Sequence, residues 1–171
     1  MPDLSDLESL LPGFMTSVCG FQGEYLTNKE KLYYRVFMRL VDEARKNYLQ
    51  AREVVLSWLE RNDDLAAIPF RFVSHMETCL NSLHRLYGVL DFQKNEKNGG
   101  LVVERSHRRS ITQYQKDANW LRGAFQHVEE KIHKGTLEGP VILTFSEDDK
   151  CIEMDGISLS FEALAKVIRE F

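Results

Sequence analysis

The sequence predicts a mainly α-helical protein, an up-and-down helical bundle followed by a small C-terminal β-meander and a last helix. Between residues 28 and 134, apolar residues recur every three or four positions, which is the period of one helix face. After Pro140 the pattern changes to short apolar runs separated by turn residues, which indicates strands. We therefore divide the chain into an N-terminal arm (1–27), a helical bundle (28–134) and a C-terminal β-hairpin and helix element (140–171).

The arm and the first two helices follow from spacing and from helix-breaking residues. Leucines at positions 4, 7, 10 and 11 precede Pro12-Gly13, which predicts a short amphipathic segment that ends there. Residues 28–61 contain no glycine or proline, so we expect one long helix or two nearly collinear ones. A second helix is expected from Pro69, which suits a first helical turn, to about Phe92.

The third helix, expected from 110 to 134, has the most regular pattern. Ser110 is followed three residues later by Gln113, which is a capping-box signature, and Lys134-Gly135 is a typical helix end. The apolar positions between them alternate spacings of three and four: Ile111, Tyr114, Ala118, Leu121, Phe125, Val128 and Ile132.

The C-terminal element is predicted to contain strands at 141–145 and 151–154. Asp155-Gly156 is a hairpin signal that leads into a further strand beginning at Ile157. Ser160 then caps a final short helix that spans residues 161–171.

Composition restricts the class of protein. The chain has 171 residues, 43% of them hydrophobic, and a net charge of −4, which is typical of a globular protein and unlike a disordered one. Its cysteines, Cys19, Cys79 and Cys151, are far apart, so we expect no disulfide framework and a reducing cytoplasm. The acidic start and the lack of a long apolar run argue against secretion and membrane insertion.

No metal or cofactor is expected. His75 and Cys79 have the i, i+4 spacing of two ligands on a helix, but no third ligand is evident nearby in the sequence. The chain also lacks a glycine-rich phosphate loop and a nucleophile elbow.

Two polar residues on the third helix raise the question of function. Arg122 and His127 are separated by four residues, and at 100° per residue they lie about 140° apart around the helix. His127 belongs to a second stripe that is distinct from the apolar seam and contains Trp120, Gly123, Ala124, His127 and Lys131. Small residues beside an aromatic one indicate close packing, either against a neighbouring helix or against a partner subunit.

An arginine and a histidine at this spacing on a late helix of a bundle resemble the HEPN superfamily. The resemblance covers about residues 28–134 and leaves the C-terminal element outside. It implies a homodimer in which the histidine-bearing helices meet at a cleft, with Trp120, Gly123, Ala124 and Lys131 at the interface. It also implies a metal-independent endoribonuclease of the toxin or defence-effector kind, with a cognate inhibitor protein, whose catalytic pair is Arg122 and His127. The family usually has a polar residue after the arginine, where this chain has Gly123.

The chemistry of this pair fits metal-free RNA cleavage. A base must take the 2′-hydroxyl proton, for which an imidazole is suited, and a cation must stabilise the phosphorane, for which a guanidinium is suited. The alternative is structural: Arg122 pairs with Glu129 or Glu130 while His127 packs beside Trp120. The protein would then be a non-catalytic dimeric helical interaction module.

A basic cluster immediately before the predicted third helix suggests a second contact with RNA. The cluster contains Arg105, His107, Arg108 and Arg109. Cations are unfavourable at a helix N-terminus, and a bound RNA phosphate would relieve that repulsion. The alternative is an ordinary solvated charge run.

Overall fold

The computed structural model describes residues 1–7, 9, 12, 27–60, 70–94, 104–136, 143–146 and 150–171. It confirms a mainly helical fold with a small antiparallel sheet, and no helix in these ranges is long and apolar enough to span a lipid bilayer. The helices are α2 (Asn28–Glu60), α3 (Phe70–Lys94), α4 (Arg105–Thr112), α5 (Gln115–Gln126), α6 (Val128–Lys134) and α7 (Phe161–Glu170). The strands are β1 (Thr144–Phe145), β2 (Cys151–Met154) and β3 (Ile157–Ser160).

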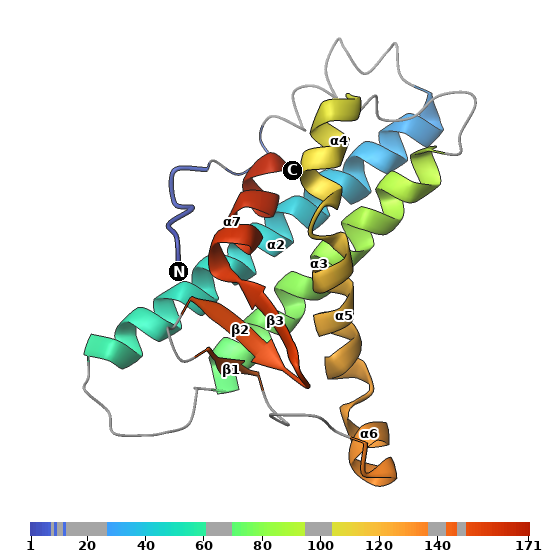
Figure 1. Cartoon of the computed structure of the whole chain (residues 1–171). Coiled ribbons are helices and arrows are strands. Elements are labelled where there is room, and N and C mark those ends of the chain that lie inside the picture. Colours follow the sequence, from blue (N-terminus) through green and yellow to red (C-terminus); the bar gives the residue numbers. More distant parts are fainter. Residues whose placement is uncertain are drawn as a thin grey trace.

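Helices α2 and α3 form an antiparallel pair that runs through the molecule. The chain then returns in the opposite direction through α4, α5 and α6, with α5 packed on α3 (Figure 1). The predicted long helix is a single helix, and it begins with a capping box. The backbone N–H of Glu30 donates to Thr27 Oγ1 (3.3 Å), and the backbone N–H of Thr27 donates to Glu30 Oε2 (2.7 Å). The buried face of α2 follows the predicted period: Leu40, Val41, Ala44, Tyr48 and Ala51.

The prediction of one helix from 110 to 134 is wrong, because the chain forms three helices there. Helix α4 begins at Arg105, so Ser110 lies inside it and is not a cap; the Gln113 side chain donates to the Ser110 carbonyl instead. The first break follows Thr112, where the buried Tyr87 hydroxyl donates to the Ile111 carbonyl at 3.2 Å. The break lets α4 contact α7 while α5 contacts α3 and the sheet.

The C-terminal element forms a three-stranded meander with the order β1-β2-β3. Asp155 and Gly156 have φ angles of 53° and 74°, as the predicted two-residue hairpin requires. Ser160 Oγ accepts the backbone N–H of Ala163 at 3.0 Å, so it caps α7 as expected. The expected first strand is shorter, at 144–145; residues 141 and 142 lie outside the described residues.

One hydrophobic core joins the helices to the C-terminal element. Phe72 of α3 is fully buried, with its ring centroid 5.0 Å from that of Phe145 and 6.4 Å from that of Phe161. Residues from α2, α3, α5, the sheet and α7 belong to the same buried cluster. The element therefore packs on the helices as part of their core.

The start of the N-terminal arm packs against the core through Leu4 and Leu7. Residues 4–7 form a turn in which the Leu7 N–H donates to the Leu4 carbonyl, and Leu4 is only 1% exposed. The Tyr48 hydroxyl donates to the Pro2 carbonyl at 3.1 Å. Most of the remaining arm, including Leu10 and Leu11, lies outside the described residues.

The arm is also tied to α7 by an exposed ion pair between Asp6 and Arg169, with N–O distances of 2.6 and 2.9 Å. The hydrogen bond from Arg169 lowers the pKa of Asp6, so the pair stabilises the folded state above the pKa of an unfolded aspartate, and this contribution is lost as the pH falls through the lowered value. We expect Asp6→Asn to lower the urea midpoint at pH 7 and to have a smaller effect at pH 3. Equal shifts at both pH values would contradict the linkage.

Candidate functional site

The predicted stripe lines an open hollow of about 480 Å³ that is bordered by α5, α6 and the start of β3. Its lining residues are Asn119, Trp120, Gly123, Ala124, His127, Glu130, Lys131, Lys134, Thr136 and Ile157. Trp120 is 53% exposed, and the Lys116 ammonium lies 4.1 Å from the centroid of its ring. The hollow therefore combines an aromatic surface with an imidazole and several cations.

The two small residues of the stripe have different roles. Ala124 is only 4% exposed, because α5 packs there on its own chain, so it contributes little surface to the interface expected for it. Gly123 faces open space: a Cβ atom there would meet nothing within 4 Å. Of the two, only Gly123 leaves room for an external group beside Trp120.

His127 occupies the joint between α5 and α6. Its φ of −113° and ψ of 12° depart from helical values, and its backbone N–H donates to the Gly123 carbonyl at 3.1 Å. The imidazole is 60% exposed, and its Nδ1 atom lies 3.3 Å from Glu130 Oε2. A carboxylate at Nδ1 favours the tautomer that carries its proton there, which leaves Nε2 as a proton acceptor.

The acids of the same chain partly neutralise the cations of the hollow. Lys134 donates to Glu130, which lowers the pKa of that carboxyl and keeps it charged at neutral pH. Lys131 pairs with Asp155, a buried residue in the β2–β3 turn. The hollow is thus an ordered network of charges and not a purely positive surface.

Arg122 points away from this hollow. Its Nε donates to Asn81 Oδ1 on α3 at 3.2 Å, and Arg122 is not among the residues that line the hollow. The angular separation from His127 inferred from the sequence is therefore retained. The expected surface pair between Arg122 and Glu129 or Glu130 is not formed.

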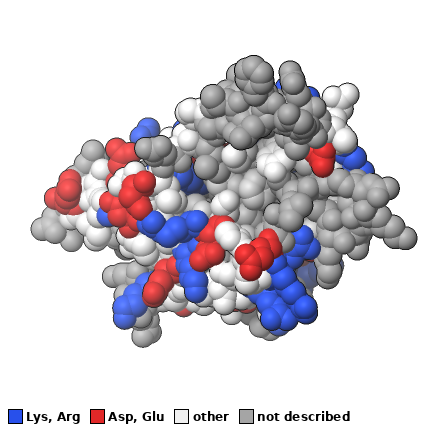
Figure 2. All heavy atoms as spheres, turned by 90° about the horizontal axis from the view of Figure 1, so that it is seen from above, with Lys and Arg blue, Asp and Glu red and all other residues white. Residues whose placement is uncertain are grey.

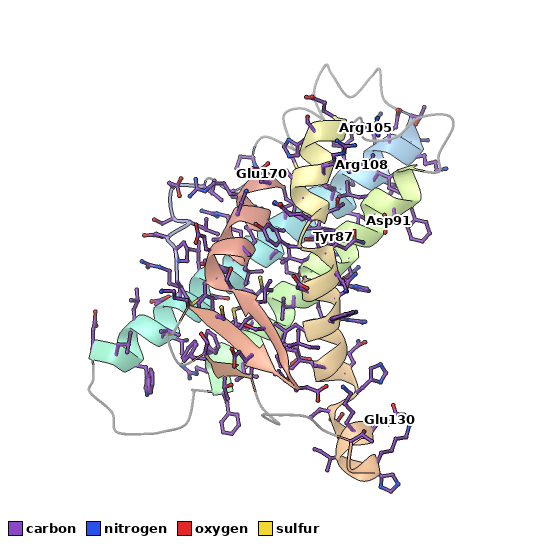
Figure 3. The ribbon with its side chains drawn as sticks, in the orientation of Figure 1. Tyr87, Asp91, Arg105, Arg108, Glu130 and Glu170 are labelled. Atoms are coloured by element: carbon purple, nitrogen blue, oxygen red, sulfur yellow. The ribbon has the colours of Figure 1, made fainter. Side chains whose placement is uncertain are left out.

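The basic cluster lies within α4 and not before it. Figure 3 shows Arg105 and Arg108 at the end of the molecule opposite to Glu130. At 1.5 Å per helical residue, the basic residues of α4 are on the order of 20 Å from the start of the hollow at Asn119. The two candidate RNA contacts are therefore separate surfaces.

Part of this basic cluster is in contact with α7 or buried within the chain. His107 Nε2 contacts the Glu170 carbonyl, and the Nε atom of Arg108 is buried without a hydrogen-bond partner in the described part of the chain. Seen from above in Figure 2, Lys and Arg side chains lie among Asp and Glu side chains over the described surface. Any electrostatic attraction for RNA at α4 would therefore come from individual basic side chains and not from the charge of the whole surface.

Several residues that surround the predicted pair could not be identified from the sequence. They are Asn81, His84, Asn119 and Lys134. For Lys134, its i, i+4 spacing from Glu130 on α6 is a sequence feature that indicates the ion pair. Within the described ranges, no group of three or more His, Cys, Asp or Glu side chains could hold a metal ion.

The open space at Gly123 leads to a stability prediction. Gly123→Ala is expected to raise the free energy of unfolding by about 0.5–1 kcal/mol, because alanine favours a helix interior and has room there. Gly135→Ala is the matched control: its site is equally open, but its φ of 64° is unfavourable for alanine, so about 1 kcal/mol should be lost. Urea unfolding measures both, and equal signs would contradict this account.

No known protein-family model, curated protein or solved structure matches the chain.

Proposed function

We propose that the protein is a HEPN-like, metal-independent endoribonuclease that acts as a homodimer. The observation that supports this proposal is the environment of His127: an exposed imidazole, oriented by Glu130, at a hollow that also contains Trp120 and two lysines. A single-stranded RNA segment suits such a surface, because its bases stack on aromatic rings and its phosphates attract cations.

The proposed reaction is a transfer within the RNA strand. His127 Nε2 takes the proton of a ribose 2′-hydroxyl, the 2′-oxygen attacks the adjacent phosphorus, and the bond to the 5′-oxygen breaks. A water molecule gives a proton to the departing 5′-oxygen, and the other fragment ends in a 2′,3′-cyclic phosphate. Arg122 stabilises the additional negative charge on the phosphorane, which requires no metal ion.

This role for Arg122 requires a second copy of the chain. Arg122 contacts α3, whereas His127 faces the hollow, so the two groups of one chain do not meet in one site. In a dimer that places the Arg122 side of α5 of one chain beside the hollow of the other, Arg122 of one chain would act with His127 of the other. Trp120, Gly123 and Lys131 would lie along that interface, and the basic residues of α4 would contact RNA farther along the strand.

A non-catalytic interaction module is the second candidate, and one observation favours it. Lys131 and Lys134 are already paired with Asp155 and Glu130, as they would be in a surface built to bind another copy of the chain. In that case the hollow would bind protein and cleave nothing.

One experiment separates these candidates. Purified protein is incubated with total RNA in excess EDTA, and its mass in solution is measured at the same concentration. The ribonuclease proposal expects a dimer and metal-independent cleavage. A dimer that leaves RNA intact at every protein concentration supports the module, and a strictly monomeric protein contradicts both.

A further inference from the structure

Helices α3 and α5 are connected by two polar contacts, which we term the polar ladder. Arg122 Nε donates to Asn81 Oδ1 at 3.2 Å, and His84 Nδ1 lies 2.8 Å from Asn119 Oδ1. The contacts are three residues apart on each helix, so at 1.5 Å per residue they are about 4.5 Å apart along the helices. All four side chains are partly buried.

The ladder leaves the charge of Arg122 uncompensated. Its partner is a neutral amide, and no carboxylate in the described part of the chain pairs with it. Only Nε is used, so the terminal guanidinium nitrogens still have donors for an external acceptor. A partly buried guanidinium attracts an anion more strongly than a solvated one and matches the geometry of phosphate oxygens.

His84 has a second polar nitrogen available for the same ligand. Asn119 Oδ1 is the partner of Nδ1, which leaves Nε2 for an external ligand; with both ring nitrogens acting as donors, Nε2 would donate to a phosphate oxygen. His84 belongs to the contact next to that of Arg122. Asn119 also lines the hollow, so the ladder adjoins the His127 site.

We propose that Arg122 and His84 together bind one phosphate group at the polar ladder. The identification of that phosphate as part of an RNA backbone rests on the proposed function. His84 is then a binding residue of the site, and it lies on a different helix from the Arg-His motif. In the proposed dimer, this phosphate would be the one that Arg122 stabilises while His127 of the other chain acts as the base.

The test uses a short fluorescent 2′-O-methyl RNA oligonucleotide, which can be bound but not cleaved, and measures its anisotropy with the full-length protein. Arg122→Ala and His84→Ala should each weaken binding about tenfold, the effect of one charge-assisted hydrogen bond. If both hold the same phosphate, the double variant should lose less than the product of the two effects. Arg122→Ala should also reduce the slope of log K against log salt by about 0.7.

His75→Ala is the matched control, because His75 is another α3 histidine with an asparagine partner. Its Nδ1 lies 3.2 Å from Asn47 Oδ1 on the α2 side, away from Arg122, and its loss should change binding less than about twofold. His84→Gln keeps a donor toward Asn119 but loses the cation, so it should bind as weakly as His84→Ala and serves if the alanine variant does not fold.

The outcomes separate the two proposals. The phosphate site is overturned if both His84 variants bind the oligonucleotide as tightly as the wild type does. It is also overturned if they lose no more affinity than His75→Ala, or if the wild type does not bind. Cleavage of natural RNA by the wild type is measured separately. Failure to cleave, with binding retained and dependent on Arg122 and His84, overturns the nuclease and leaves the phosphate site supported.

Discussion

His127→Ala is expected to lower the rate of RNA cleavage in EDTA by about 10²–10⁴-fold, the usual contribution of a general base. The reason is local: the exposed imidazole is removed from the hollow, whereas the buried core does not include it. Cleavage of a labelled RNA under single-turnover conditions measures the effect. Circular dichroism and the urea midpoint should remain close to those of the wild type.

His133→Ala is the matched control for this prediction. His133 is an exposed histidine on the same short helix α6, but it does not line the hollow, so cleavage should be unchanged. Glu130→Gln should give an intermediate loss, because the amide can still contact the imidazole but carries no charge. Equal losses in His127→Ala and His133→Ala would contradict the assignment of the base.

Mixing variants tests whether the catalytic pair is formed across the dimer. If Arg122 of one chain acts with His127 of the other, a mixture of Arg122→Ala and His127→Ala proteins contains mixed dimers with one intact site of two. Random exchange of subunits then restores about a quarter of the wild-type rate. A mixture as inactive as its components would indicate that no pair is shared between chains.

Phe72→Ala is expected to have the largest effect on stability, about 3–5 kcal/mol in the free energy of unfolding. Phe72 is fully buried and contacts Phe145 of β1 and Phe161 of α7, so its removal leaves a cavity between the helices and the C-terminal element. Urea unfolding should still show one transition, because both parts belong to the same buried cluster.

Phe70→Ala provides the control at the start of the same helix. Phe70 is 80% exposed, and its replacement should change the free energy of unfolding by less than about 0.5 kcal/mol. Similar effects of the two substitutions, or a separate transition for the C-terminal element in Phe72→Ala, would contradict the shared core.

The parts of the fold that depend on local sequence could be predicted. The period of α2, the Asp155-Gly156 turn and the Ser160 cap each depend on residues that are neighbours in the chain. The break after Thr112 could not be predicted, because it is accompanied by a hydrogen bond from Tyr87, 24 residues earlier. Local signals cannot report such a contact, and the regular spacing from Ile111 to Ile132 is compatible with both arrangements.

The candidate site shows the same limit. The stripe that contains Trp120, Gly123 and His127 followed from helical geometry, and the structure brings these residues to one hollow. Arg122 was identified by its spacing from His127, but its contact with Asn81 is 41 residues distant in sequence. Which side chains surround a residue depends on how the helices pack, and the polar ladder therefore became visible only in three dimensions.

The contact between Lys131 and Asp155 connects the β-meander to the hollow, to which β3 also contributes Ile157. Because α6 is held at its middle by the hairpin turn, a change in the turn would shift that short helix about its joint and alter the width of the opening. Replacing Asp155 by glycine keeps the backbone bend but releases the lysine. Substitutions in the β2–β3 turn could thus change the size of the ligand that fits the hollow, while the residues that line the hollow stay the same.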